Sequence, residues 1–146
     1  MIILLPAMFF MQSLPAIKKE IDQQYLKWDK AVVAHNIKTL DSMMAVDFWA
    51  KLAGPEKPTN KKGYIAAIKK RWNDGGTKEL AYMTKIDKIE VVRSERPKLS
   101  LFAVTIQNDL IFKLRNGSKS KFSQKLCDTW QKSGVTWQIV KSENLD

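Results

Sequence analysis

The chain has very few residues that could form disulfides or hold a metal: one cysteine, Cys127, and one histidine, His35, in 146 residues. A single cysteine excludes a disulfide within the chain, and the pair is too small for a zinc site built from cysteine and histidine. We therefore expect no metal and no cofactor. Cys127 lies in a strand-like stretch far from His35, which favours a packing role over nucleophilic catalysis.

Acidic residues are also scarce, since 15 Asp and Glu stand against 25 Lys and Arg, for a formal charge of +10. Such a surface attracts anions, whether a metabolite, an acidic lipid or polysaccharide, or nucleic acid. The lysines are scattered, and their densest runs are only Lys61-Lys62 and Lys69-Lys70-Arg71. No pattern of aromatic residues typical of an RNA-binding sheet accompanies them, so we interpret the charge as a solvated basic surface and do not expect nucleic acid as a partner.

The chain has no apolar run long enough for a stable membrane span. Its longest, Ile2–Met11, is followed by Ser13-Leu14-Pro15-Ala16 and then by charged residues. That order is typical of a secretory signal peptide, so we predict one over residues 1–16 and export to the periplasm or the exterior. The alternative is a buried N-terminal arm of a cytoplasmic protein.

The remaining residues, 17–146, have the size of one domain. Apolar residues at helical spacing, beginning with Ile17 and Ile21, predict a helix over 17–34. Asn36 is a suitable cap for a shorter helix over 37–44, and Thr59 or Asn60 for a third helix that ends at 73–76.

Beyond Thr77 the pattern is that of strands. Leu80, Tyr82, Thr84 and Ile86 share one parity, whereas Ile89 and Val91 share the other, which predicts a β-bulge near Asp87-Lys88 and a curved sheet. Asn116-Gly117 predicts a two-residue hairpin turn, and Ser133-Gly134 a further turn. Helices followed by successive antiparallel strands predict an α+β fold.

Several sequence landmarks occur in a familiar order: Ala34-His35-Asn36 after the first helix, Asp47-Phe48 after the second, and Asp128–Gly134 followed by Trp137–Val140. In these features residues 17–142 resemble the SnoaL-like domains of the nuclear transport factor 2-like superfamily. The resemblance implies a cone in which N-terminal helices pack into a strongly curved, mainly antiparallel sheet and leave a pocket at the open end. Many relatives have Gly-Asp in place of His35-Asn36, and a histidine where this chain has Glu143.

The resemblance leaves the activity open, because the superfamily includes isomerases, dehydratases, epoxide hydrolases and cyclases as well as domains that bind or assemble without catalysis. Whether this chain is an enzyme must be argued from its own residues.

Strand parity places polar groups among the apolar residues of the inner face. If Trp130 faces the helices, Gln124 and Asp128 do so too, and Lys141 and Glu143 share the face of Trp137. With walls from the first helix, the predicted pocket comprises Tyr25, Trp28, Gln124, Asp128, Trp130, Lys141 and Glu143.

Within this pocket, the candidate general bases are Asp128 and Glu143, with Tyr25 or Lys141 stabilising negative charge. The structural alternative is that Asp128 pairs with a neighbouring strand and that Lys141 and Glu143 are solvated. His35 falls at a helix end, which favours capping or solvent exposure over catalysis.

We therefore predict an exported domain that binds a small, anionic organic ligand in an apolar cone. One alternative is a cofactor-free isomerase, dehydratase or cyclase that uses a pocket carboxylate. The other is an interaction module that forms a homodimer through the outer sheet face, which would display Lys121, Lys125, Thr129 and Gln131.

Overall fold

Three helices pack against one six-stranded sheet in the computed structural model, which describes residues 13–52, 57–92 and 99–146. The apolar run Ile2–Met11 lies outside the described residues. In chain order the elements are α1 (Leu14–Val33), α2 (Ile37–Met43), β1 (Met44–Lys51), β2 (Thr59–Asn60), α3 (Lys61–Asn73), β3 (Thr77–Val92), β4 (Ser100–Leu114), β5 (Lys119–Ser133) and β6 (Thr136–Asn144).

The helix boundaries follow from capping residues. Asn36 caps α2 by accepting a hydrogen bond from the Thr39 N–H at 3.2 Å, and Asn60 caps α3 by accepting one from the Gly63 N–H at 2.9 Å. Both caps were predicted. The first helix begins earlier than the apolar spacing indicated, because the Ser13 side chain accepts from the Ala16 N–H and so caps α1.

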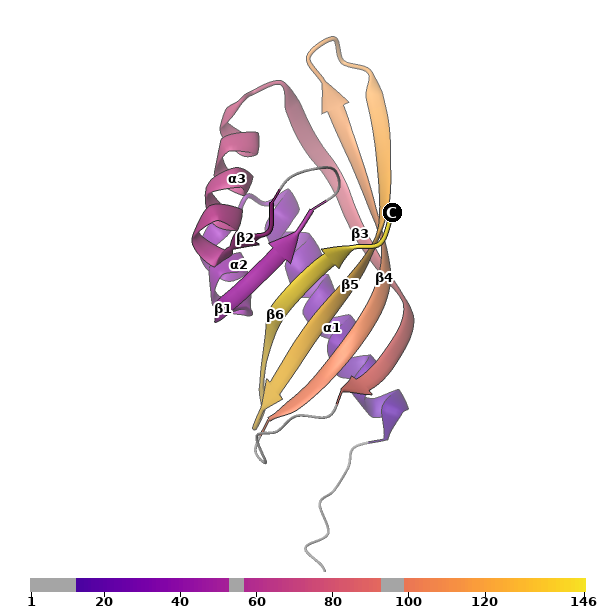
Figure 1. Cartoon of the computed structure of the whole chain (residues 1–146). Coiled ribbons are helices and arrows are strands. Elements are labelled where there is room, and N and C mark those ends of the chain that lie inside the picture. The colour runs from indigo at the N-terminus through magenta and orange to yellow at the C-terminus, as the bar shows by residue number, and fades with distance from the viewer. Residues whose placement is uncertain (1–12, 53–56, 93–98) are drawn as a thin grey trace, which may run out of the picture.

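The sheet has the order β2-β1-β6-β5-β4-β3, and β1 runs parallel to β6 while every other pair is antiparallel. Its long strands curve around α1, and α2 and α3 lie beside β1 (Figure 1). Trp130, near the C-terminal end of β5, is fully buried on the inner face of the sheet, together with Ile21 of α1 and Phe48 of β1. The predicted α+β fold with a curved, mainly antiparallel sheet is confirmed.

Among the described residues, three β-bulges interrupt the antiparallel pairing of the sheet, and the parallel pairing of β1 with β6 is irregular between Met44 and Trp49. The predicted one is at Asp87, which has no partner between the pairs Ile86 with Ile106 and Lys88 with Thr105. A second bulge, at Leu80, was not predicted; it leaves the Leu80 side chain 38% exposed and turns Glu79 inward, where it is only 4% exposed. The third is at Val140 in β6.

The β4–β5 hairpin closes at the predicted place, with a loop that is one residue longer than predicted. Leu114 donates its backbone N–H to the Ser118 carbonyl and accepts from the Gly117 N–H, both at 2.9 Å. Gly117 has a φ of 83°, a left-handed conformation that glycine adopts without strain. The hairpin extends beyond the helices at the top of Figure 1.

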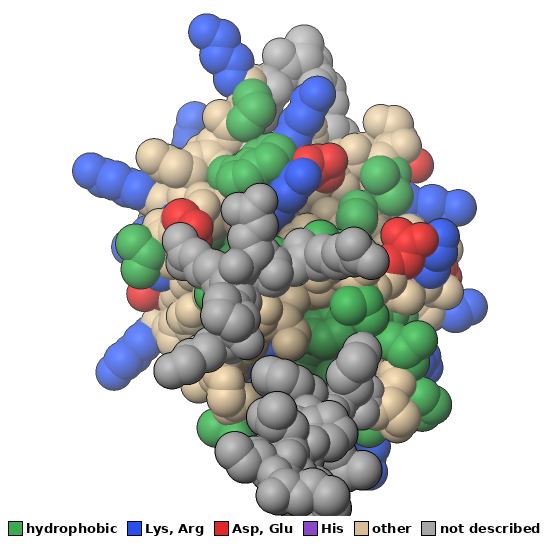
Figure 2. Space-filling view, turned by 60° about the horizontal axis from the view of Figure 1, so that its bottom comes forward, with side chains coloured by type: hydrophobic (Ala, Val, Ile, Leu, Met, Phe, Trp, Pro, Cys, Tyr) green, Lys and Arg blue, Asp and Glu red, His purple; other side chains and the backbone are tan. Residues whose placement is uncertain are grey.

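Basic side chains are spread over the surface. Viewed from the end where α1 begins, lysine and arginine side chains project all around the outline, with few acidic side chains between them (Figure 2). Among the described residues, no helix is both long enough and apolar enough to cross a membrane.

Candidate functional site

An outer cavity of about 360 Å³ lies between α3 and the inner face of the sheet. Its walls are largely apolar and include four aromatic side chains: Trp28 from α1, Tyr64 from α3, Tyr82 from β3 and Phe122 from β5. Arg71 of α3 also lines it. This combination of apolar walls and a few polar groups is typical of pockets that bind small organic molecules.

A smaller inner chamber continues from the outer cavity towards the centre of the sheet. The two share Trp28, Tyr64, Tyr82 and Asn108 as lining residues, and the inner chamber is about 20 Å³, which is room for one water molecule. Asp128 lines this inner chamber but not the outer cavity.

Asp128 is buried and accepts two short hydrogen bonds. The Tyr25 hydroxyl donates to Oδ2 at 2.7 Å, and the Ser142 hydroxyl donates to Oδ1 at 2.6 Å. The Trp130 indole N–H in turn donates to the Tyr25 oxygen at 2.9 Å, with the two rings edge to face. This network joins α1 to β5 and β6 through buried side chains.

Burial raises the pKa of the Asp128 carboxyl to about 6, although the hydrogen bonds from Ser142 and Tyr25 act to lower it. Burial, together with the neighbouring Asp128 charge, raises the pKa of Tyr25 well above its ordinary value. Asp128 therefore titrates near neutral pH, while Tyr25 stays protonated as a donor.

A second polar network crosses the sheet from Asp29 of α1. The Asp29 carboxylate accepts the Thr84 backbone N–H at 3.0 Å and the Thr84 hydroxyl at 2.8 Å. Asn108 donates to the Thr84 oxygen at 3.1 Å, and Gln124 donates to Asn108 at 3.4 Å. Burial raises the pKa of Asp29 to about 6.

The sequence reasoning missed Asp29, although a signal was present. Asp29 follows Ile21 and Tyr25 at intervals of four residues, so it belongs to the apolar stripe of α1. A carboxylate on that stripe requires buried hydrogen-bond donors, and Thr84 provides them. Asn108 was also missed; it lies in the polar run Gln107-Asn108-Asp109, which interrupts the apolar pattern of its strand.

Five of the seven predicted pocket residues surround the two cavities: Tyr25, Trp28, Gln124, Asp128 and Trp130. The other two, Lys141 and Glu143, do not, and the parity prediction for them is wrong. The β-bulge at Val140 shifts the register, so that Ser142 pairs with Asp128 on the inner face. Lys141 and Glu143 lie on the outer face as an ion pair, and the Lys141 ammonium is 4.9 Å from the centre of the Trp49 ring.

His35 lies at the end of α1, as predicted, in a left-handed conformation with a φ of 53°. Its ring stacks on Trp72, with centroids 4.5 Å apart, and its Nε2 is 2.9 Å from the buried Glu79 carboxylate. The other Glu79 oxygen is 3.4 Å from Nε of Arg71. His35 thus takes part in a cluster that holds Arg71 beside the outer cavity.

Among the described residues, no group of three or more His, Cys, Asp or Glu side chains is arranged to hold a metal ion. The outer sheet face displays Lys121, Lys125, Thr129 and Gln131, as predicted. Whether a second copy covers that face stays a prediction.

No protein-family model matches the sequence, and a comparison with curated proteins finds no significant match. Solved structures do resemble it. A conserved protein from Planctomyces limnophilus has a TM-score of 0.70 at 18% identity, over 89% of this chain and 95% of its own. Aln2 from a Streptomyces species has a TM-score of 0.69 at 12% identity, over 90% of this chain and 91% of its own. An NTF2-like protein of unknown function from Pseudomonas putida has a TM-score of 0.60 at 17% identity, over 89% of this chain and 86% of its own.

At these identities the likeness concerns the fold. The chain has the nuclear transport factor 2-like fold, as the sequence resemblance implied.

The raised pKa of Asp128 predicts an unusual dependence of stability on pH. The folded pKa, about 6, exceeds the ordinary value of 3.8, so the native state binds the proton more tightly than the unfolded state. Protonation of Asp128 therefore stabilises the folded state. This contribution to the free energy of unfolding is fully present below the unfolded pKa and is lost as pH rises through the folded pKa. From Asp128 we expect the free energy of unfolding to fall by roughly 1 kcal/mol between about pH 5 and about pH 7.5, with Asp29 acting in the same direction.

Urea titrations at both pH values measure this effect. Asp128→Asn keeps an oxygen for the Tyr25 hydroxyl but cannot ionise, so it should reduce the pH dependence while the protein stays folded. Identical pH dependence in the variant and the natural protein would contradict the assignment.

Proposed function

We propose that this chain binds a small organic ligand whose apolar or aromatic body occupies the outer cavity. The proposal rests on that cavity: about 360 Å³ of space between α3 and the sheet, lined by Trp28, Tyr64, Tyr82 and Phe122. Such a volume is within the range of small-molecule sites. Asn108 and Gln124 are the polar side chains that would orient the ligand.

Arg71 supports an anionic ligand. It lines the cavity, its side chain is 47% exposed, and Glu79 engages its Nε. The terminal amino groups of the guanidinium are then oriented by the Glu79 contact and can pair with a carboxylate or sulfonate.

Two features favour binding over catalysis. The inner chamber admits only a water-sized group, so a ligand in the outer cavity does not touch Asp128. In addition, each Asp128 oxygen already accepts a hydrogen bond, from Tyr25 and from Ser142. Asp128 is therefore accounted for as a structural acceptor.

Two fluorescent probes of similar shape test the cavity and its charge preference: anionic anilinonaphthalene sulfonate and neutral phenylnaphthylamine. Leu110 lines the outer cavity, so Leu110→Trp should fill it and lower the affinity for both probes by roughly tenfold or more. Arg71→Gln should lower the affinity for the anionic probe several-fold and leave the affinity for the neutral probe unchanged.

The matched control for this test is Leu26→Trp, at an exposed position of α1 away from the cavity. Unchanged binding of both probes to Leu110→Trp would place them elsewhere and refute the proposed site.

A second candidate function is catalysis by Asp128 as a general base. The observation that favours it is the pKa of about 6, which suits a base that works near neutral pH, beside the Tyr25 hydroxyl as a donor. Substrate would reach Asp128 through a side-chain movement of Tyr64 or Tyr82, or through one bridging water.

Native mass spectrometry identifies any co-purifying ligand, which is then incubated with the protein in deuterium oxide. Proton abstraction would introduce deuterium at carbon, and Asp128→Asn should slow that exchange by about 100-fold or more. Glu143→Gln, on the outer face, is the control and should exchange normally. No deuterium uptake with the natural protein would exclude this chemistry for that ligand.

We also propose that the protein is exported, on the basis of the apolar run and the near absence of cysteine. Ala16 lies in the first turn of α1, so cleavage directly after it would remove the Ser13 cap.

Expression in a secreting host followed by intact-mass measurement tests export. The expected result is a mass lacking about the first 16 residues in the exported fraction. A full-length chain confined to the cytoplasm would refute export and leave the ligand-binding proposal untouched.

A further inference from the structure

Three lysines face one another across the outer surface of the sheet. Lys78 of β3 is directly opposite Lys113 of β4, which is directly opposite Lys119 of β5. All three are exposed, and no acidic side chain of the described residues forms an ion pair with any of them. Like charges at directly opposed positions destabilise a sheet, so this row has an unfavourable interaction that a bound anion would relieve.

The same surface carries more lysines further along the strands. Lys121 follows Lys119 on the same side of β5, and Lys85 and Lys125 occupy a row on either side of Gln107. Asp109, between these rows, pairs with Lys121. We name this surface the lysine face; it comprises Lys78, Lys85, Lys113, Lys119, Lys121 and Lys125.

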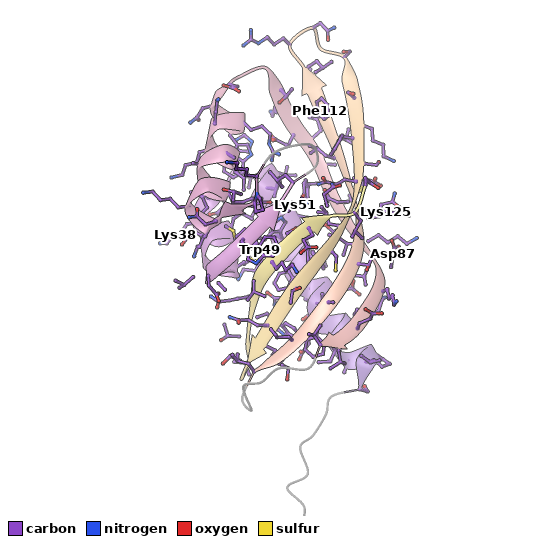
Figure 3. The ribbon with its side chains drawn as sticks, viewed as in Figure 1. Lys38, Trp49, Lys51, Asp87, Phe112 and Lys125 are labelled. Atoms are coloured by element: carbon purple, nitrogen blue, oxygen red, sulfur yellow. The ribbon has the colours of Figure 1, made fainter. Side chains whose placement is uncertain are left out.

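The opposite side of the same hairpin is apolar. Leu110 and Phe112 of β4 and Phe122 of β5 lie on this side, and Phe122, which directly follows Lys121, is 48% exposed. Phe112 and Lys125, both labelled in Figure 3, therefore belong to opposite sides of the ribbon. The hairpin extends past the helices (Figure 1), so its charged side and its apolar side both border the same projecting end.

We propose that this hairpin docks the protein on an anionic lipid surface. The lysine face would contact the headgroup phosphates, while the apolar side chains at the projecting end enter the boundary between headgroups and hydrocarbon. A lipid surface offers both chemistries at one place, whereas a soluble polyanion offers only charge. Leu110 and Phe122 also line the outer cavity, so docking holds the rim of that cavity beside the lipid.

Co-sedimentation with vesicles tests the proposal. The full chain is mixed with vesicles of phosphatidylcholine alone or with added phosphatidylglycerol, at low and high salt. We expect binding to the anionic vesicles only, and its loss at high salt. Lys78→Gln/Lys113→Gln/Lys119→Gln should weaken binding by roughly tenfold or more, because each lysine near an anionic surface contributes separately.

The matched control is Lys19→Gln/Lys27→Gln/Lys38→Gln, which removes the same charge from exposed positions of α1 and α2 and should bind almost normally. Phe112→Ser separates lipid from other anions: it should weaken vesicle binding and leave binding to heparin unchanged. Thermal unfolding followed by circular dichroism verifies that each variant is folded.

Three results would overturn the proposal. Equal loss in both triple variants would mean that net charge alone drives binding. Binding to heparin or single-stranded DNA without binding to vesicles would assign the lysine face to a soluble polyanion. A dimer in sedimentation velocity that dissociates in the Lys78, Lys113 and Lys119 variant would assign the face to a second copy of this chain.

Discussion

The β-bulges constrain everything else in this structure, because each one bends the sheet and exchanges the two faces of the strand beyond it. The bulge at Leu80 turns Glu79 inward, where it contacts His35 and Arg71. The bulge at Val140 turns Ser142 inward, where it donates to Asp128. Without these shifts the inner face would present Leu80 and Lys141, and the polar networks at the cavities would lose their donors and acceptors.

Buried carboxylates connect the helices to the curved sheet. Asp128 joins α1 to β5 and β6 through Tyr25 and Ser142, and Asp29 joins α1 to β3 through Thr84. Glu79 joins β3 to the end of α1 and to α3. Asp128 and Asp29 each accept two hydrogen bonds, and Glu79 contacts His35 and Arg71, which offsets the cost of burying charge. For Asp128 and Asp29 the compensation is incomplete, since burial still raises their pKa values to about 6.

This placement of the acids also shapes the outside of the protein. The formal charge is +10, and two acidic side chains, Asp29 and Asp128, are buried in hydrogen-bonded networks away from the lysines at the surface. The exposed surface is therefore more cationic than the composition indicates.

The sequence by itself determined the helices, through apolar spacing and the caps Asn36 and Asn60, because these interactions span only a few residues. It also determined the α+β order of elements and the Asp87 bulge, where the apolar alternation visibly changes phase. The sequence also predicted a pocket that contains Tyr25, Trp28, Asp128 and Trp130, and all four line the inner chamber, because each follows the period of its own helix or strand.

Only the tertiary structure decided the rest. From Trp137 to Glu143 no phase change is visible in the sequence, and the bulge at Val140 arises from how β6 pairs with β5. Thr84 is 55 residues from Asp29, and nothing local indicates their pairing. The cavity volumes depend on how α3 packs over the sheet. Side-chain alternation fixes the two faces of one strand, but the hydrogen bonds to its neighbour decide which residue is left out of the pairing, and so which side chains reach the site.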